Sequence, residues 1–257
     1  MNDVIPESHR HEEKEMPFLE HLEELRWRLL NSLAAIVAGA ILAYFFSDEI
    51  LAILIKPYHD ATSHLFNGEA KKLIFLNPTG GFMLHVKLAI FSGFLVALPV
   101  VFYQIWQFVV PGLLEKERKY VPLVVFLSTL CFAAGALFCY FVVLRYGLRF
   151  LLSFESADLV ATLSVNEYLE FITMLILVFG IVFEMPILAF ILSKIGLLTP
   201  AFMRHYRRHG IVTMFIIAAV ITPTGDIINQ LLLAGPLIVL YEVSILVSKI
   251  ARKHSYE

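Results

Sequence analysis

Residues 16–30, MPFLEHLEELRWRLL, form an amphipathic segment that leads without a break into the apolar run 32–46. Pro17 suits the first position of a helix, where its missing N–H costs nothing. The apolar side chains recur at i, i+3, i+4 and i+7 and make one apolar stripe, while acids and arginines take the other faces. The pattern predicts a helix that enters a membrane and holds its carboxylates beside the headgroups. Alternatively, Glu20, Glu24 and Arg28 form an i, i+4 ladder that only supports an exposed helix.

The composition extends this membrane prediction to the whole chain. Of its 257 residues, 59% are hydrophobic and 16% are charged, whereas soluble domains are roughly 45–50% apolar and about 25% charged. We therefore expect an all-α, polytopic membrane protein whose single transmembrane domain covers 17–250. The polar segment 1–16 is expected to be a disordered cytoplasmic tail without the features of a cleavable signal peptide. Residues 251–257 are expected to be a second cytoplasmic tail.

Six transmembrane helices are predicted, at about 28–46, 82–110, 120–144, 165–192, 211–222 and 228–247. The fifth is short, because 12 residues span only ~18 Å of a hydrocarbon core about 30 Å thick. The sixth is also expected to be short, because Gly235-Pro236 interrupts it. No internal repeat stands out.

Several residues mark the expected helix boundaries. A helix capped at Ser47 is expected to stop near Pro57, and Pro99 is expected to kink the second span. Residues 145–166 are expected to form an external cap, ending in a capping box from Ser164 to Glu167. Thr199-Pro200 should start a further helix.

Lysine and arginine predict the orientation. Of the 20 such residues, 14 lie in segments on the same side as the N-terminus, five lie on the opposite side, and Lys87 lies within the second span. Because cytoplasmic loops carry the excess of these residues, both termini are predicted to be cytoplasmic. The net charge of −2 gives no basic field for nucleic acid. Cys131 and Cys139, eight residues apart on one helix, are too distant for a disulfide.

Glu184, deep in the fourth span, needs an explanation, because an acid at mid-membrane costs roughly 2.5–3.5 kcal/mol. It is either a polar site for a partner helix or substrate, or a protonated carboxyl bonded to a neighbouring helix. Glu242 lies nearer a membrane surface, where local pairing is the simpler expectation. Lys87 is expected to extend to the outer interface along its own stem.

Two further groups of polar residues lie just beyond the end of a predicted span. Asp226, with Gln230 four residues on, follows the short fifth helix; it is either an N-cap or a contact for a small partner protein. Glu117 lies in the charged turn 113–119, which resembles an ordinary solvated face. If Glu117 and Glu24 share one interface, two carboxylates could bind two guanidinium groups through bidentate bonds that lysine cannot copy.

No catalytic or metal-binding motif is found, and His21 with Glu24 lacks further ligands. The sequence therefore favours a non-enzymatic membrane protein without a cofactor.

The sequence resembles the TatC family, whose members are the membrane receptor subunit of the twin-arginine protein translocase. The resemblance covers about residues 17–250. It rests on His21 to Arg26, on Pro99 to Phe108, on Pro111 to Arg118, on Phe179 to Pro186, and on Thr222-Pro223 followed by Asp226 and Gln230. One departure is Gly225, which lengthens the turn before Asp226. The resemblance implies six spans and a concave, glove-like bundle in a bacterial-type inner membrane.

The resemblance also implies roles for individual residues. Glu24 and Glu117 match the acids that receive the paired arginines of a signal peptide, and Arg26 and Phe108 match their neighbours. Glu184 matches an intramembrane acid on the concave face. Asp226 and Gln230 match a region that contacts TatA- or TatB-type single-span subunits. Pro57 and Pro99 match structural helix breakers.

The resulting hypothesis is a receptor for twin-arginine signal peptides of folded cargo. It would nucleate a larger translocation complex driven by the proton-motive force. Two alternatives remain: a proton-coupled small-molecule carrier that uses Glu184, and a scaffold or insertase for other membrane helices.

Overall fold

The computed structural model describes residues 18–65, 71–110, 118–153, 163–221 and 227–253, and these are almost entirely helical. The elements are α1 (Phe18–Tyr44), α2 (Ser47–Leu65), α3 (Gly80–Val109), α5 (Val121–Phe138), the π-helical turn η2 (Cys139–Val143), α6 (Leu144–Leu152), α7 (Val165–Phe183), α8 (Met185–Lys194), α9 (Pro200–His205), α10 (Arg207–Ile221) and α11 (Ile227–Lys253). Within the described ranges, a single bridge between Ile74 and Ser164 is the one β-type pairing.

Five helical segments are long and apolar enough to cross a membrane: Glu20–Tyr44, Gly80–Val109, Val121–Leu152, Val165–Lys194 and Gln230–Ala251. The prediction of an all-α, multi-pass membrane protein is therefore confirmed for the described residues. The predicted short fifth helix corresponds to α10, whose 15 residues rise about 22 Å. A count of six spans stays a prediction.

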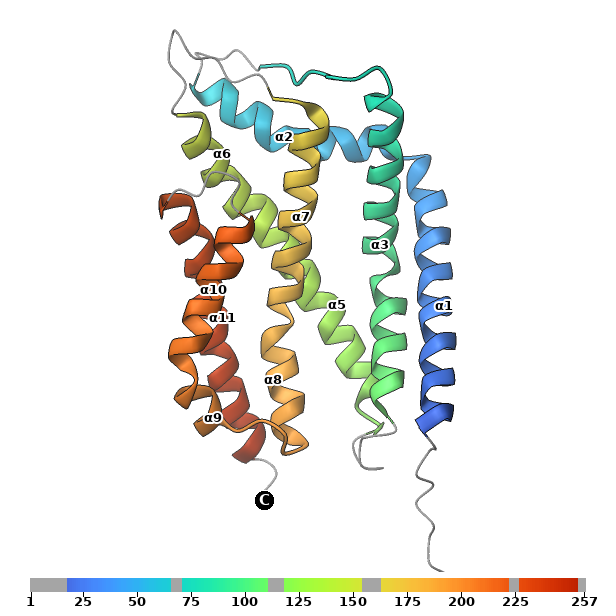
Figure 1. Ribbon diagram of the computed structural model, residues 1–257, viewed down its shortest axis with the longest axis vertical. Coiled ribbons are helices and arrows are strands. Elements are labelled where there is room, and N and C mark those ends of the chain that lie inside the picture. Colours follow the sequence, from blue (N-terminus) through green and yellow to red (C-terminus); the bar gives the residue numbers. More distant parts are fainter. Residues whose placement is uncertain (1–17, 66–70, 111–117, 154–162, 222–226, 254–257) are drawn as a thin grey trace, which may run out of the picture.

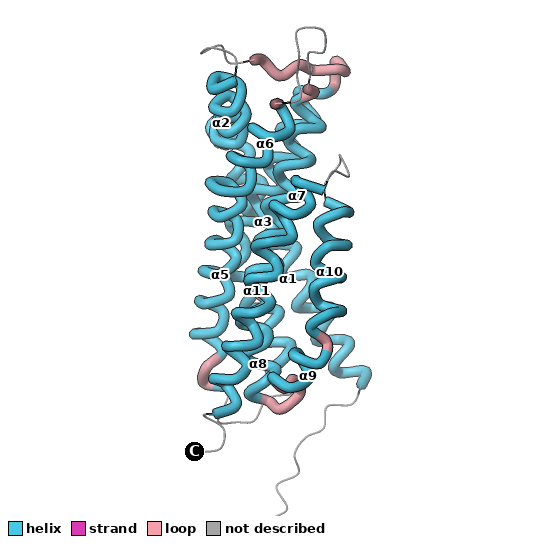
Figure 2. The backbone as a smooth tube through the Cα atoms, turned by 90° about the vertical axis from the view of Figure 1, so that its left-hand side faces the viewer, coloured by secondary structure: helices cyan, strands magenta, loops and turns pink. Residues whose placement is uncertain are grey.

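The helices form an elongated bundle (Figure 1). α1 packs beside α3 on one flank, and α10 packs on α11 on the other, with α7 and α8 between the flanks. α2 lies across one end, which we call the α2 end. α1 begins, α3 ends, α5 begins and α11 ends at the opposite end, near α9, which we call the α9 end (Figures 1 and 2).

Two helices continue through prolines that were expected to stop them. α2 continues past Pro57, where the helix was expected to stop, and ends at Leu65. α11 continues through Gly235-Pro236 to Lys253, so the predicted short, interrupted sixth helix is wrong, and the first residues of the expected tail are helical. In both helices the residue directly after the proline is buried in the hydrophobic core: Tyr58 in α2 and Leu237 in α11. Packing of this kind holds a helix together despite one missing hydrogen bond. Pro99 likewise lies within the continuous α3.

The third span is also longer than predicted. The sequence predicts an end at residue 144 and an external cap from 145, but η2 and α6 extend the helical path to Leu152. Leu144, Leu148 and Leu152 are buried at i, i+4 and i+8, and α6 packs against α2. This apolar stripe keeps the segment helical.

The two predicted helix starts differ in outcome. Thr199 caps α9 as expected, because its Oγ1 accepts a hydrogen bond from Phe202 N at 3.1 Å. Ser164 takes the extended N-cap conformation before α7, but its side chain makes no capping bond, so the predicted capping box does not form. The amide of Val165 instead donates to Ile74 O at 2.9 Å. A long-range backbone contact therefore satisfies the first N–H group of α7.

Candidate functional site

Glu24 lies near the start of α1, in a polar network with α3. Its side chain is 20% exposed. Arg28, one turn later, donates from Nε to Glu24 Oε1 at 2.9 Å and from Nη2 to the same oxygen. Arg28 Nη1 also donates to Gln104 Oε1 on α3 at 3.3 Å. The i, i+4 pairing read from the sequence is therefore present, and it also ties α1 to α3.

The second carboxylate oxygen of Glu24 has no hydrogen-bond partner among the described residues, although it is buried. His21 Nδ1 lies 3.8 Å from it, which is too far for a hydrogen bond. The His21 ring stacks on Phe108 of α3, with centroids 4.2 Å apart and planes at 14°. The site thus combines a buried carboxylate, a guanidinium and a stacked ring pair.

Glycines allow α1 and α3 to approach this closely. A Cβ on Gly93 of α3 would lie 2.3 Å from the backbone nitrogen of Ala40 in α1, and one on Gly39 would lie 2.6 Å from Gly93 O. Small residues at helix crossings are how membrane helices bring their backbones together. This crossing sets the distance at which Gln104 and Phe108 meet α1.

The structure brings together some of the predicted binding residues. Glu24 and Phe108 both contact His21. Arg26 is exposed, and two residues on from Glu24 it points to a different side of α1. Glu117 lies outside the described residues. Gln104 and the stacking role of His21 were not predicted from the sequence. The one available signal was that Gln104 lies a single turn before Phe108.

Glu184 lies at the break between α7 and α8 and is 7% exposed. It lies beside Ser128 and Phe132 of α5. Neither Glu184 Oε1 nor Ser128 Oγ has a hydrogen-bond partner among the described residues. Pro186 follows at the start of α8. The expected buried intramembrane acid is therefore present, at a point where the helix is interrupted.

Near the start of α11, Gln230 donates from Nε2 to Phe215 O of α10 at 3.1 Å. Gln230 therefore joins α11 to the preceding helix. Asp226 lies outside the described residues. Glu242 pairs with Arg207 of α10 at 2.5 Å, which confirms the expectation of local pairing for this acid.

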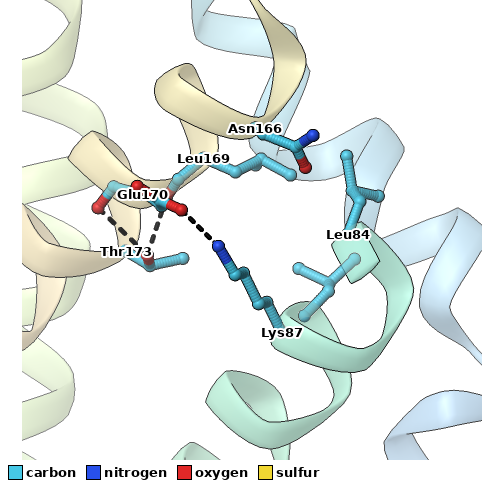
Figure 3. Close-up of a pocket in the computed structure, with 7 residues that line it drawn as sticks. Leu84, Lys87, Asn166, Leu169, Glu170 and Thr173 are labelled. Atoms are coloured by element: carbon cyan, nitrogen blue, oxygen red, sulfur yellow. Dashed lines mark hydrogen bonds and ion pairs between the residues drawn. The ribbon is translucent and has the colours of Figure 1, made fainter. Parts of the chain in front are cut away.

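Lys87 forms an ion pair between two helices, and its extension to the outer interface stays a prediction. It pairs with Glu170 of α7, and both side chains are about half exposed. Figure 3 shows the two side chains meeting between α3 and α7, beside Asn166 and Thr173. A carboxylate within reach on the neighbouring helix explains why the ammonium lies toward α7.

No described group of three or more His, Cys, Asp or Glu side chains is placed to hold a metal ion. Cys131 and Cys139 are both free.

The helical bundle and its polar groups define a multi-pass membrane protein with an acid–arginine site at the α9 end and a buried acid at a helix break. A family model described as Sec-independent protein translocase protein (TatC) matches residues 20–236. The chain belongs to this family, whose members are transport components and not enzymes.

Individual relatives agree with this assignment. The Sec-independent protein translocase protein TatC of Carboxydothermus hydrogenoformans is 37% identical over 95% of this chain and 98% of its own length. That of Aquifex aeolicus is 40% identical over 94% of this chain and 98% of its own length. A crystal structure described as the twin arginine translocase receptor TatC superposes with a TM-score of 0.79 at 39% identity, covering 90% of this chain and 99% of that one.

Proposed function

We propose that this chain recognises the twin-arginine signal peptides of folded proteins and nucleates a translocation complex driven by the proton-motive force. The observation that carries the proposal is the Glu24 carboxylate. One of its oxygens already holds the guanidinium of Arg28, and the other has no partner among the described residues. The site is therefore built for guanidinium groups and retains an acceptor for one more.

The second acid of the proposed site is Glu117. It directly precedes Arg118, the first described residue before α5, at the same α9 end as Glu24. Two carboxylates at this end would bind two adjacent arginines, each with charge-assisted bonds of roughly 1.5–3 kcal/mol. The stacked rings of His21 and Phe108 offer a flat surface for a guanidinium plane, and Arg26 completes the site from the exposed side of α1.

We infer six spans, with α10 as the short fifth, in a concave, glove-like bundle in the inner membrane of a bacterial-type cell. The excess of lysine and arginine on one side supports cytoplasmic termini. The apolar part of the signal peptide would lie along the concave wall near Glu184. Pro57 and Pro99 would shape the cap and the second span.

We further propose that TatA- and TatB-type single-span subunits contact this chain around Asp226, Gln230 and α10. Gln230 lies where α11 meets α10, and α10 is too short to fill the hydrocarbon core, which leaves room for a partner helix. Several copies would associate in the active complex. We assign no role to nucleic acid.

The test is binding of a photo-crosslinkable twin-arginine peptide to the full chain in membranes. Glu24→Gln and Glu117→Gln should each weaken binding by tenfold or more, and each should reduce the preference over a twin-lysine peptide. Glu20→Gln is the matched control, because Glu20 is exposed on the same helix. Unchanged recognition in both site variants would reject the assignment.

A proton-coupled carrier is the second candidate, and the buried Glu184 beside Ser128 favours it over a scaffold or insertase. Vesicles that contain this chain alone separate the two functions. A carrier would accumulate a small solute on its own when a proton gradient is imposed, whereas a translocase receptor would not.

A further inference from the structure

A hollow of about 450 Å³ opens at the α9 end, between the end of α3, the start of α5, α8 and α11. Its walls are apolar and include Trp106, Val124, Leu127, Ile187, Phe190 and Val247. Among the described residues that line it, Lys194 is the one charged side chain. Three of the residues that line it are buried and form a separate hydrophobic cluster: Trp106, Val121 and Ile191. The hollow therefore has well-packed walls.

Two ammonium groups lie at the mouth of the hollow. Lys194 Nζ is 4.3 Å from the centroid of the Tyr120 ring, and Lys119 Nζ is 5.1 Å from the same ring. Neither lysine forms an ion pair with a described carboxylate. Both ammonium groups lie within cation–π distance of one exposed tyrosine.

The hollow has the depth and opening that a lipid chain needs. Along α8 it extends from Lys194 back to Pro186, which is about 12 Å of helix. Leu123 and Leu127 line it and are themselves 55% and 39% exposed, so the hollow opens sideways on the outer surface of the bundle. An occupant therefore needs an apolar tail of this length and a head that suits two cations.

We propose that this hollow binds an anionic phospholipid, with an acyl chain along α8 and the headgroup phosphate at Lys119 and Lys194. Basic pockets between transmembrane helices near the cytoplasmic surface suit anionic headgroups. Charge complementarity decides between a lipid and the apolar segment of a signal peptide. The two lysines attract a phosphate but repel the positively charged end of a twin-arginine peptide.

Trp106 lines the hollow and reports directly on its occupant. The full chain has two tryptophans, so Trp27→Phe leaves Trp106 as the sole tryptophan, whose emission can be excited selectively over that of tyrosine. Brominated lipids are added to phosphatidylcholine vesicles that contain this protein. Brominated phosphatidylglycerol should quench Trp106 at a mole fraction about 10- to 30-fold lower than brominated phosphatidylcholine. This ratio is expected because two lysines near the surface each attract an anionic headgroup. In the same background, Lys119→Gln with Lys194→Gln should abolish this preference.

Two further variants complete the design. Lys249→Gln removes an exposed lysine at the same end but outside the hollow, and it should keep the preference. Val124→Phe fills the hollow and should reduce quenching by both lipids. Equal quenching by the two lipids in the parent protein, or a preference that survives the double substitution, would overturn the proposal. Release of quenching by a twin-arginine peptide, but not by the same peptide without its apolar segment, would assign the hollow to the peptide instead.

Discussion

Arg28 occupies the carboxylate that an incoming arginine would use. Both of its hydrogen bonds to Glu24 end on Oε1, and Gln104 holds its remaining nitrogen. Under the proposed function the incoming arginine would bind Oε2, so Arg28 on Oε1 competes with it for the negative charge of the same carboxylate. Arg28→Gln should therefore tighten binding of a twin-arginine peptide by up to about tenfold, because a charge-assisted bond is worth roughly 1.5–3 kcal/mol.

Fluorescence polarisation with a labelled peptide measures this affinity. Arg145→Gln is the matched control, since Arg145 is an exposed arginine on α6, outside the proposed site. Weaker binding in Arg28→Gln, with Arg145→Gln unchanged, would mean that Arg28 positions Glu24 and does not compete with the peptide.

The buried side chain of Glu184 allows a test of its effect on thermal stability. Its Oε1 is buried without a hydrogen-bond partner among the described residues, so a charge there costs desolvation that a neutral amide of similar shape avoids. We expect Glu184→Gln to leave the melting temperature in detergent unchanged or a few degrees higher. Glu184→Ala should lower it, because truncation leaves a cavity beside Ser128. A clear loss of stability in Glu184→Gln would show that the carboxylate makes a bond essential to the fold.

At the scale of elements, local signals predicted more than long-range ones. The cap at Thr199 and the pairing of Glu24 with Arg28 each depend on residues within one turn, and both are present. The predictions at Pro57, Pro236 and Ser164 were wrong because contacts with residues far away in the sequence determine where these helices end and how they are capped. Buried neighbours carry the helices past the two prolines, and the backbone of Ile74 replaces the serine cap. The contact from Arg28 to Gln104 joins residues 76 apart, which no local spacing reveals.

The close contact of α1 with α3 can be tested by one substitution. Gly93→Ala would place a methyl group 2.3 Å from Ala40 N, so the two helices must separate. We expect a loss of about 1–3 kcal/mol in stability and weaker peptide binding, because Glu24 moves away from Phe108. Thermal unfolding and peptide binding are measured together.

Gly147→Ala is the control for that substitution, because a Cβ there meets nothing within 4 Å and alanine favours the helix. Equal behaviour of the two variants would show that the crossing tolerates separation, and that close approach of α1 to α3 is not needed for the site.

For the whole molecule, the separation of charge along the bundle is the basis of the proposed orientation. Most lysines and arginines belong to segments at the α9 end, where α1 begins and α11 ends, and few belong to the α2 end. The Glu24 network and the lysine-rimmed hollow lie at that basic end, so one orientation places both at the cytoplasmic surface. There, under the two proposals above, they would meet both unexported cargo and the anionic lipids of the inner leaflet.

Membrane-impermeant maleimide labelling tests this orientation. Cys131→Ala with Cys139→Ala gives a background without cysteine, because these are the two cysteines of the chain. Lys72→Cys and Lys249→Cys then place one exposed thiol at the α2 end and the α9 end respectively. In intact bacterial cells that express the chain, Lys72→Cys should be labelled, and Lys249→Cys should be labelled only after lysis. The reverse pattern would place Glu24 outside the cytoplasm, where it could not meet a signal peptide before export.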